Sequence, residues 1–269
     1  MKISIIMIDG LFREYFHLLE ALNQQTLPKE NWEAIWIEFY DSIHPELQER
    51  DNLTTVQLGN RREDVYHSSY CFNEGIRRSS GDVLVIMDAD LFPTPSFLTQ
   101  VDEAHRHCKN LALYFYRWDE PESAHDSSMS YSLDHLKRSC RLVNSMNYGG
   151  CLTIRKEWLL KVNGYEEDSA FSTLHANGAD MYTRLKNKGL HIAWHPTERL
   201  FHPWHPQSLA ASKSYEGQLS IIRQRELNLS TLPNEGLDPH ITKEVRESPV
   251  PSRSRFDIPG RAVRRLFGR

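Results

Sequence analysis

Short, continuous apolar runs alternate with segments of helical periodicity along the first half of the chain. Runs at residues 2–8, 34–39 and 83–87 have the length and composition of strands that are covered on both faces of a sheet. Between them, residues 12–25 and 68–80 carry apolar side chains at helical spacing. Alternation of strands and helices favours parallel pairing through right-handed crossovers. The pattern therefore predicts an α/β domain with a mostly parallel central sheet flanked by helices.

The second half of the chain is less regular. The pattern predicts strands at residues 111–116, 148–154 and 191–195, and helices at residues 156–162 and 179–188. Residues 118–138 are polar and lack a clear period. Because loops of this length in compact domains tend to be functional or disordered, we expect this segment to act as a lid.

The pattern fades from about residue 236, which predicts an ordered domain over residues 1–235 and a flexible tail over residues 236–269. Residues 252–269 contain six arginines and one aspartate, although the chain as a whole has a net charge of −4. This asymmetry favours a tail that contacts something anionic, and its last nine residues fit a short basic amphipathic turn on a membrane. A solvated terminus is the alternative.

Composition excludes several classes of protein. With 269 residues, of which 39% are hydrophobic and 25% charged, the chain is neither collagen-like, disordered nor a coiled coil. Its weakly acidic balance argues against a nucleic-acid partner.

The four cysteines have no CxxC spacing and are expected to be thiols in a reducing compartment. The N-terminal apolar run stops at Asp9 without a cleavage site, so we expect a first strand, no membrane span and a cytoplasmic protein.

The sharpest local signal is Asp88-Ala89-Asp90, directly after the apolar run at residues 83–87. Open α/β sheets bind ligands at the carboxyl ends of their strands. Two carboxylates at positions i and i+2 can both turn toward one hard cation, and magnesium or manganese held in this way bridges to substrate phosphates. The alternative is that these acids only cap the next loop.

Three further groups are candidates for chemistry. His202 and His205, in a proline-rich segment, can supply imidazole to the same metal, although thirteen histidines make chance pairs common. Asp180, at the start of a predicted helix, is either a catalytic carboxylate or half of an ordinary ion pair with Arg184. Gly149-Gly150 allows either close approach of a ligand to the backbone or a bulge.

Taken in order, these segments resemble the A-type glycosyltransferase fold, particularly the family 2 inverting glycosyltransferases. The resemblance covers residues 2–206, and its second half is similar to the catalytic region of β-1,4-galactosyltransferases and chondroitin-polymerase-like enzymes. The stretches that carry it are WEAIWIEFYDS, FNEGIRRSSGDVLVIMDAD, NYGGCLTIRKEW, NGADMYTRLKNKGL and FHPWHP.

The resemblance implies a single glycosyltransferase domain at residues 1–235, with a nucleotide-sugar half at 1–115 and an acceptor and catalytic half at 140–206. It implies manganese or magnesium bound by Asp88, Asp90 and either His205 or His202. It implies Asp180 as the general base. The donor is expected to contact Asp9, Glu38, Asn73, Arg77, Asp88, Ala89 and Gly150.

The implied function is transfer of a sugar, with inversion, from a nucleotide-diphosphate sugar to a glycan or lipid-linked glycan, as in polysaccharide biosynthesis. A UDP-sugar is the expected donor, and Tyr148, Gly149, Gly150 and Trp204 are expected to shape the sugar and acceptor cleft. Ala179 replaces the glutamate that this family carries beside the base. A catalytically inactive nucleotide-sugar-binding module is therefore the alternative, whereas a nucleotidyltransferase is disfavoured because its glycine-rich basic loop is absent from the sequence.

Overall fold

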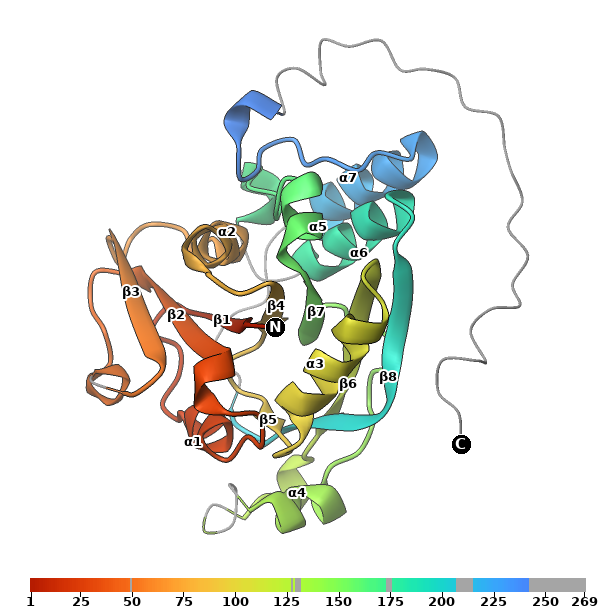
Figure 1. Cartoon of the computed structure of the whole chain (residues 1–269). Coiled ribbons are helices and arrows are strands. Elements are labelled where there is room, and N and C mark those ends of the chain that lie inside the picture. The colour runs from red at the N-terminus through yellow and green to blue at the C-terminus, as the bar shows by residue number, and fades with distance from the viewer. Residues whose placement is uncertain (49, 127, 129–131, 173–175, 207–214, 242–269) are drawn as a thin grey trace.

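Four parallel strands make up the first half of the central sheet (Figure 1). The computed structural model describes residues 1–48, 50–126, 128, 132–172, 176–206 and 215–241. The four strands are β1 (Ile3–Asp9), β2 (Trp32–Tyr40), β3 (Leu53–Asn60) and β4 (Val83–Met87), and they pair in the order β3-β2-β1-β4. All residues of β1 and β4 are buried, which confirms the strands predicted from continuous apolar runs.

The second half of the sheet has mixed strand directions. It continues from β4 through β7 (Cys151–Arg155), β6 (Leu111–Asp119), β8 (His191–His202) and the short β5 (Phe92–Pro93). Strand β7 is antiparallel to both β4 and β6, β5 is antiparallel to β8, and β6 and β8 are parallel. The α/β class is therefore confirmed, with an eight-stranded mixed sheet in the described part of the chain.

The helices cover both faces of the sheet (Figure 1). They are α1 (His17–Asn23), α2 (Ser68–Arg78), α3 (Phe97–His107), α4 (Leu133–Ser139), α5 (Lys156–Lys161), α6 (Asn177–Asn187) and α7 (Tyr215–Asn228), with short 3₁₀ turns at Lys29–Asn31, Pro45–Leu47, Glu122–Ala124 and Ser169–Phe171. Ile5 faces a core with α1 and α3, whereas its neighbour Ile6 faces a core with α2, α5 and α6. Successive strand residues thus supply two separate cores.

Helix α1 begins later than the sequence pattern predicts, at His17 rather than at residue 12. Leu11 has a left-handed backbone with φ 57°, and Phe16, just before the helix, has φ −119° and ψ 35°, outside the helical region. Phe12 packs edge-on against Tyr66, with ring centroids 4.9 Å apart. The apolar residues at 12 and 16 therefore serve tertiary packing before the helix starts.

The sequence pattern does not predict β3, α3 or α7. It also predicts that the last strand ends at residue 195, whereas β8 continues to His202. Strand β3 lies at the sheet edge and alternates between exposed and half-buried positions, so it lacks a continuous apolar run. Helix α7 buries Gln218, Ile222 and Arg225, two of which are polar. An apolar stripe is therefore missing from its sequence.

The chain after residue 235 packs on the fold for at least three residues. The Leu237 N–H donates to Asn163 O at 3.1 Å, and the Asp238 N–H donates to Asn163 Oδ1 at 2.7 Å. The rest of the predicted tail, residues 242–269, lies outside the described residues. Within the part that is described, no helix has both the length and the apolar character to cross a bilayer.

Candidate active site

The carboxyl ends of β1 and β2 bring two predicted donor-binding acids to one edge of the sheet. Asp9 lies opposite Glu38 in the parallel register, and both side chains are buried. Burial and the neighbouring Asp9 carboxyl raise the pKa of Glu38 to about 7. Burial also raises the pKa of Asp9, although the charge of Arg13 opposes this effect. The pair therefore holds a proton more readily than free carboxyl groups do.

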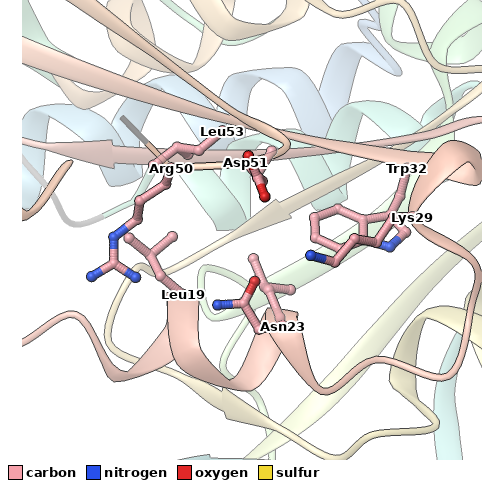
Figure 2. Close-up of a pocket in the computed structure, with 9 residues that line it drawn as sticks. Leu19, Asn23, Lys29, Trp32, Arg50, Asp51 and Leu53 are labelled. Atoms are coloured by element: carbon pink, nitrogen blue, oxygen red, sulfur yellow. The ribbon is translucent and has the colours of Figure 1, made fainter. Parts of the chain in front are cut away.

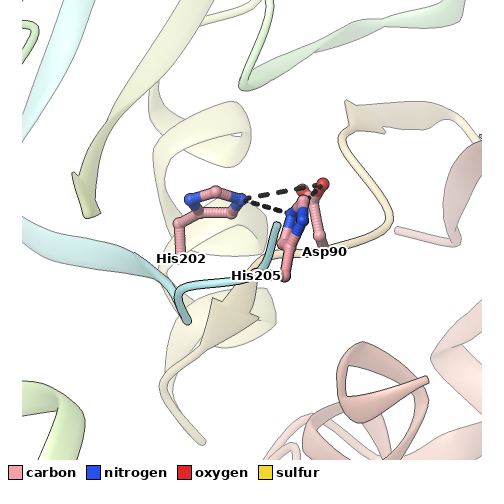
Figure 3. Close-up of side chains that lie close together, drawn as sticks. All are labelled: Asp90, His202 and His205. Atoms are coloured by element: carbon pink, nitrogen blue, oxygen red, sulfur yellow. Dashed lines mark hydrogen bonds and ion pairs between the residues drawn. The ribbon is translucent and has the colours of Figure 1, made fainter. Parts of the chain in front are cut away.

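Three side chains predicted to bind metal, named the metal-binding group, meet at the same edge, between the segment after β4 and the end of β8 (Figure 3). Asp90 Oδ2 lies 3.7 Å from His202 Nε2 and 3.5 Å from His205 Nε2. The two Nε2 atoms are 3.2 Å apart. One carboxylate and two imidazoles at this spacing suit a single divalent cation. The structure thus brings together three of the four residues predicted to bind metal.

The fourth predicted ligand, Asp88, is not part of this group in the described structure. Its backbone N–H donates to Gly150 O at 3.0 Å, and the Gly150 N–H donates to Asn147 Oδ1 at 3.1 Å. Ala89 between the two acids is fully buried. Burial and the nearby Asp90 carboxylate raise the pKa of Asp88 to about 7. Gly150 therefore acts on this segment through its backbone, which holds the Asp88 main chain.

Asp90 is half-buried and pairs with a positive charge from the segment after β1. Arg13 Nη1 lies 2.8 Å from Asp90 Oδ2, and Arg13 Nε lies 3.9 Å from Asp9 Oδ1. Burial opposes ionisation of Asp90, but Arg13 and the two histidines hold its pKa well below the usual range. The His17 imidazole donates to Asp90 O at 2.7 Å, and burial lowers the pKa of His17 to about 4.

Asp119, which the sequence analysis missed, orients one of the metal-binding histidines. His202 Nδ1 lies 3.0 Å from Asp119 Oδ1, which leaves Nε2 facing Asp90. Burial alone would lower the pKa of His202, but Asp119 and Asp90 together raise that pKa to about 9. The available signal was an acid a few residues beyond the apolar run at residues 111–116; in the structure it is the last residue of β6 and lies opposite His202 in the parallel register with β8.

The described part of the predicted lid at residues 118–138 forms hydrogen bonds with residues 202–206, named the histidine segment. Buried Glu120 accepts a hydrogen bond from Trp204 N at 3.0 Å. The same carboxylate contacts His125 Nδ1 at 2.9 Å and His135 Nε2 at 2.6 Å. Trp204, predicted to shape the cleft, packs its ring near His125 instead. Residues 127 and 129–131 lie outside the described residues, and a lid stays a prediction.

A cavity of about 460 Å³ opens beside the metal-binding group. It is lined by Ile8, Phe12, Arg13, Tyr66, Phe72, Asp88, Asp90, Arg117, Asn144, Met146, Asn147, Tyr148, Gly149, Asn177, Ala179 and Tyr215. Tyr148 and Gly149, predicted to shape the sugar and acceptor cleft, are among these residues. The cavity therefore joins the predicted donor side at Asp88–Asp90 to the predicted acceptor side.

Two predicted donor contacts have structural roles instead. The Asn73 amide donates to Tyr165 O at 2.9 Å and to Glu167 Oε1 at 2.6 Å, and its oxygen accepts from Tyr165 N at 2.8 Å. Arg77 donates to Leu237 O at 3.0 Å on the surface. Both side chains are thus engaged in holding turns of the fold, and their contact with a donor stays a prediction.

Asp180, the predicted general base, is buried in a group of ion pairs. Its side chain has 0% exposure, lies 2.8 Å from Arg184 Nε and also pairs with Arg225, which pairs in turn with Glu166. Asp180 does not line the larger cavity, whereas its neighbour Ala179 does. The structure therefore shows the ion pair with Arg184 that was the alternative, and a catalytic role for Asp180 stays a prediction.

A smaller cavity of about 220 Å³ lies between α1 and the amino ends of β2 and β3 (Figure 2). It is lined by Leu19, Leu22, Asn23, Lys29, Trp32, Ala34, Arg50, Asp51 and Leu53. Arg50 pairs with Glu20 and Glu46 across its rim. None of the residues predicted for chemistry lies here, so the larger cavity is the candidate active site.

The mixed sheet, with Asp88–Asp90 at its carboxyl edge, defines an A-type glycosyltransferase fold. Residues 61–162 match the model of the family described as Glycosyl transferase family 2. The predicted resemblance to this family is therefore confirmed for that part of the chain, whereas the resemblance to galactosyltransferases and chondroitin polymerases is not tested.

Similarities to individual proteins agree with this family match. A curated Methanococcus voltae protein, "Dolichyl N-acetyl-alpha-D-glucosaminyl phosphate 3-beta-D-2,3-diacetamido-2,3-dideoxy-beta-D-glucuronosyltransferase", is 30% identical over 115 residues. The match covers 39% of this chain and only 35% of that protein. S. aureus TarS 1–349 with UDP-GlcNAc has a TM-score of 0.60 at 16% identity, over 91% of this chain and 70% of the other. The Pyrobaculum calidifontis mannosyltransferase with GDP-Man and Mn2+ has a TM-score of 0.51 at 14% identity, over 93% and 66%.

Replacing Glu38 by glutamine should change how stability depends on pH. The pKa of this carboxyl is near 4.5 when unfolded and about 7 when folded, so its contribution to stability falls as pH rises between these values. We expect Glu38→Gln to stabilise the protein by about 1–3 kcal/mol more at pH 8 than at pH 5. Urea unfolding at both pH values measures this, and equal effects at the two would contradict it.

A control with the opposite sign is available at Glu33. Although burial opposes its ionisation, hydrogen bonds from Lys2, Ser4 and Ser80 lower the pKa of Glu33 to about 2. Glu33→Gln should therefore destabilise the protein by similar amounts at pH 6 and pH 8, because both values lie above the pKa in either state.

Asp180→Asn should act on stability. Removing one charge of the Asp180–Arg184–Arg225 group leaves a buried positive charge without its partner, at a cost of about 3–5 kcal/mol. Urea unfolding of the variant measures this loss. A variant as stable as the wild type, with turnover abolished, would restore Asp180 as the catalytic base.

Asp119→Asn should weaken metal binding at Asp90, His202 and His205. A carboxylate that orients a ligating histidine typically contributes about 10–100-fold to metal affinity. Calorimetric titration with manganese measures the change, and Asp134→Asn, at an exposed position of α4, is the control. Equal affinity of the Asp119 variant and the wild type would exclude this role.

Proposed function

We propose that this chain is a metal-dependent glycosyltransferase that moves a sugar from a nucleotide-diphosphate sugar to an acceptor hydroxyl of a glycan or lipid-linked glycan. The observation that carries the proposal is the meeting of Asp90, His202 and His205 beside the larger cavity. The family match at residues 61–162 and the similarity in fold to proteins solved with UDP-GlcNAc and GDP-Man support it. A UDP-sugar is the proposed donor, and a relative whose printed name begins with dolichyl supports a lipid-linked acceptor.

The residues present fit a divalent cation. Asp90 Oδ1 is buried without a hydrogen-bond partner among the described residues, and Oδ2 faces both histidines. A mixed oxygen and nitrogen set of this kind suits manganese. When bound, the cation neutralises negative charge on the departing diphosphate. Arg13 and Arg117 line the same cavity and add positive charge for the phosphates.

The acceptor side of the cavity carries polar and aromatic side chains. Tyr148 offers a flat ring for the apolar face of a sugar, and Asn147 and Asn177 offer amides for its hydroxyl groups. An inverting displacement, which we retain as part of the proposal, needs a base on this side. The buried position of Asp180 directs the search for that base to other groups at the cavity.

One observation favours a second candidate, a nucleotide-sugar-binding module without transferase activity. Ala179 lines the cavity where the resembling family carries a carboxylate, and the adjacent Asp180 is enclosed by arginines. Such a module would keep the metal-binding group and the cavity, so it would bind donor without turning it over.

Donor hydrolysis distinguishes the two candidates. The purified protein is incubated with a panel of nucleotide sugars, first with manganese and then with chelator. We expect metal-dependent release of nucleoside diphosphate from one donor, reduced at least about 100-fold in Asp90→Asn, since the cation stabilises the leaving group. Asp134→Asn should retain wild-type release.

Metal-dependent binding of one donor without release, also in the presence of glycan acceptors, would favour the binding module. Neither binding nor release across the panel would overturn both candidates.

A further inference from the structure

An exposed apolar turn forms one side of the mouth of the larger cavity. All residues from 141 to 146 are exposed, and they include Leu142, Val143 and Met146. Val143 is 76% exposed and Met146 57% exposed. Asn144 and Met146 also line the cavity. Apolar side chains exposed next to a cavity mark a surface that another molecule covers.

This turn is held in place at both ends. On one side, Arg141 and Asp119 exchange backbone hydrogen bonds of 2.8 and 2.9 Å, and the preceding Cys140 is buried in a small core. On the other side, Asn147 Oδ1 accepts from the N–H groups of Gly149 and Gly150 at 3.1 Å each. The fold therefore holds the apolar side chains out at a fixed place beside the cavity.

Positive charge surrounds the turn. Lys137 and Arg138 are exposed in the last turn of α4, and Arg141 begins the exposed run. No acidic residue occurs in the sequence between Asp134 and Glu157. Apolar side chains flanked by basic ones are typical of segments that lie at the interface of an anionic bilayer, because insertion and charge attraction add together.

We propose that residues 137–146 dock on an anionic lipid bilayer and bring the cavity mouth to the membrane surface. Resting on the proposed function, this assigns the acceptor to the class of lipid-linked glycans, whose sugar enters the cavity while the lipid stays in the bilayer. The basic charges and the position at the cavity mouth favour a bilayer over a protein partner.

The test is co-sedimentation of the full chain with vesicles of phosphatidylcholine alone or mixed with phosphatidylglycerol. We expect wild-type protein to sediment with the anionic vesicles and much less with the neutral ones. The Val143→Asp/Met146→Asp double variant should lose at least about tenfold in binding, because it removes apolar insertion and adds repulsion.

A matched control uses two exposed leucines, one on α7 and one just after that helix. Leu227 and Leu229 are 76% and 64% exposed, and α7 and α4 lie at opposite ends of the molecule (Figure 1). Leu227→Asp/Leu229→Asp should sediment like the wild type. Wild-type sedimentation of the Val143/Met146 variant would overturn the proposal and leave the binding to another part of the chain, such as the basic tail. Equal losses in both variants would also overturn it.

Donor release without vesicles, measured on the same preparations, separates this inference from the proposed function. Release without sedimentation would overturn the docking surface and leave the glycosyltransferase standing. Sedimentation that depends on Val143 and Met146, without donor release in any condition, would support docking and overturn the enzymatic proposal.

Discussion

The constraint on which the site depends is the charge of one half-buried carboxylate, that of Asp90. An ionised carboxylate away from water is costly unless positive charge and hydrogen bonds compensate it. Arg13, His202 and His205 supply that compensation from two segments far apart in sequence. Arg13 reaches Asp90 from the non-helical segment between β1 and α1, and the two histidines reach it from the end of β8 and the segment that follows.

A second buried charge group has the opposite character. Asp180, Glu166, Arg184 and Arg225 form a closed set of two acids and two bases that joins α6 to α7. The group around Asp90 borders a cavity, whereas Asp180 is enclosed. Both contain carboxylates at positions that resemble a known family, yet only the first is arranged to meet a ligand. The difference lies in the surroundings of each carboxylate.

The histidine segment links the metal-binding group to the mouth of the cavity. Asp119 orients His202, Glu120 holds the backbone of Trp204, and Arg141 pairs with Asp119 through the main chain. The exposed turn that follows Arg141 is therefore built on the same strand end as the metal-binding group. A surface that binds the acceptor's carrier and a site that binds its sugar would share one rigid support.

The sequence by itself determined the buried strands, because continuous apolar runs such as residues 83–87 are stable only in a sheet covered on both faces. It also placed Asp88 and Asp90 at the ligand-binding edge, since that edge follows from strand direction. Only the tertiary structure decided which acids face the cavity. Arg225 lies 45 residues from Asp180, and Asp119 lies 83 residues from His202. Whether a carboxylate binds metal, takes a proton or neutralises an arginine depends on charges that folding brings from such distances, and no local pattern contains them.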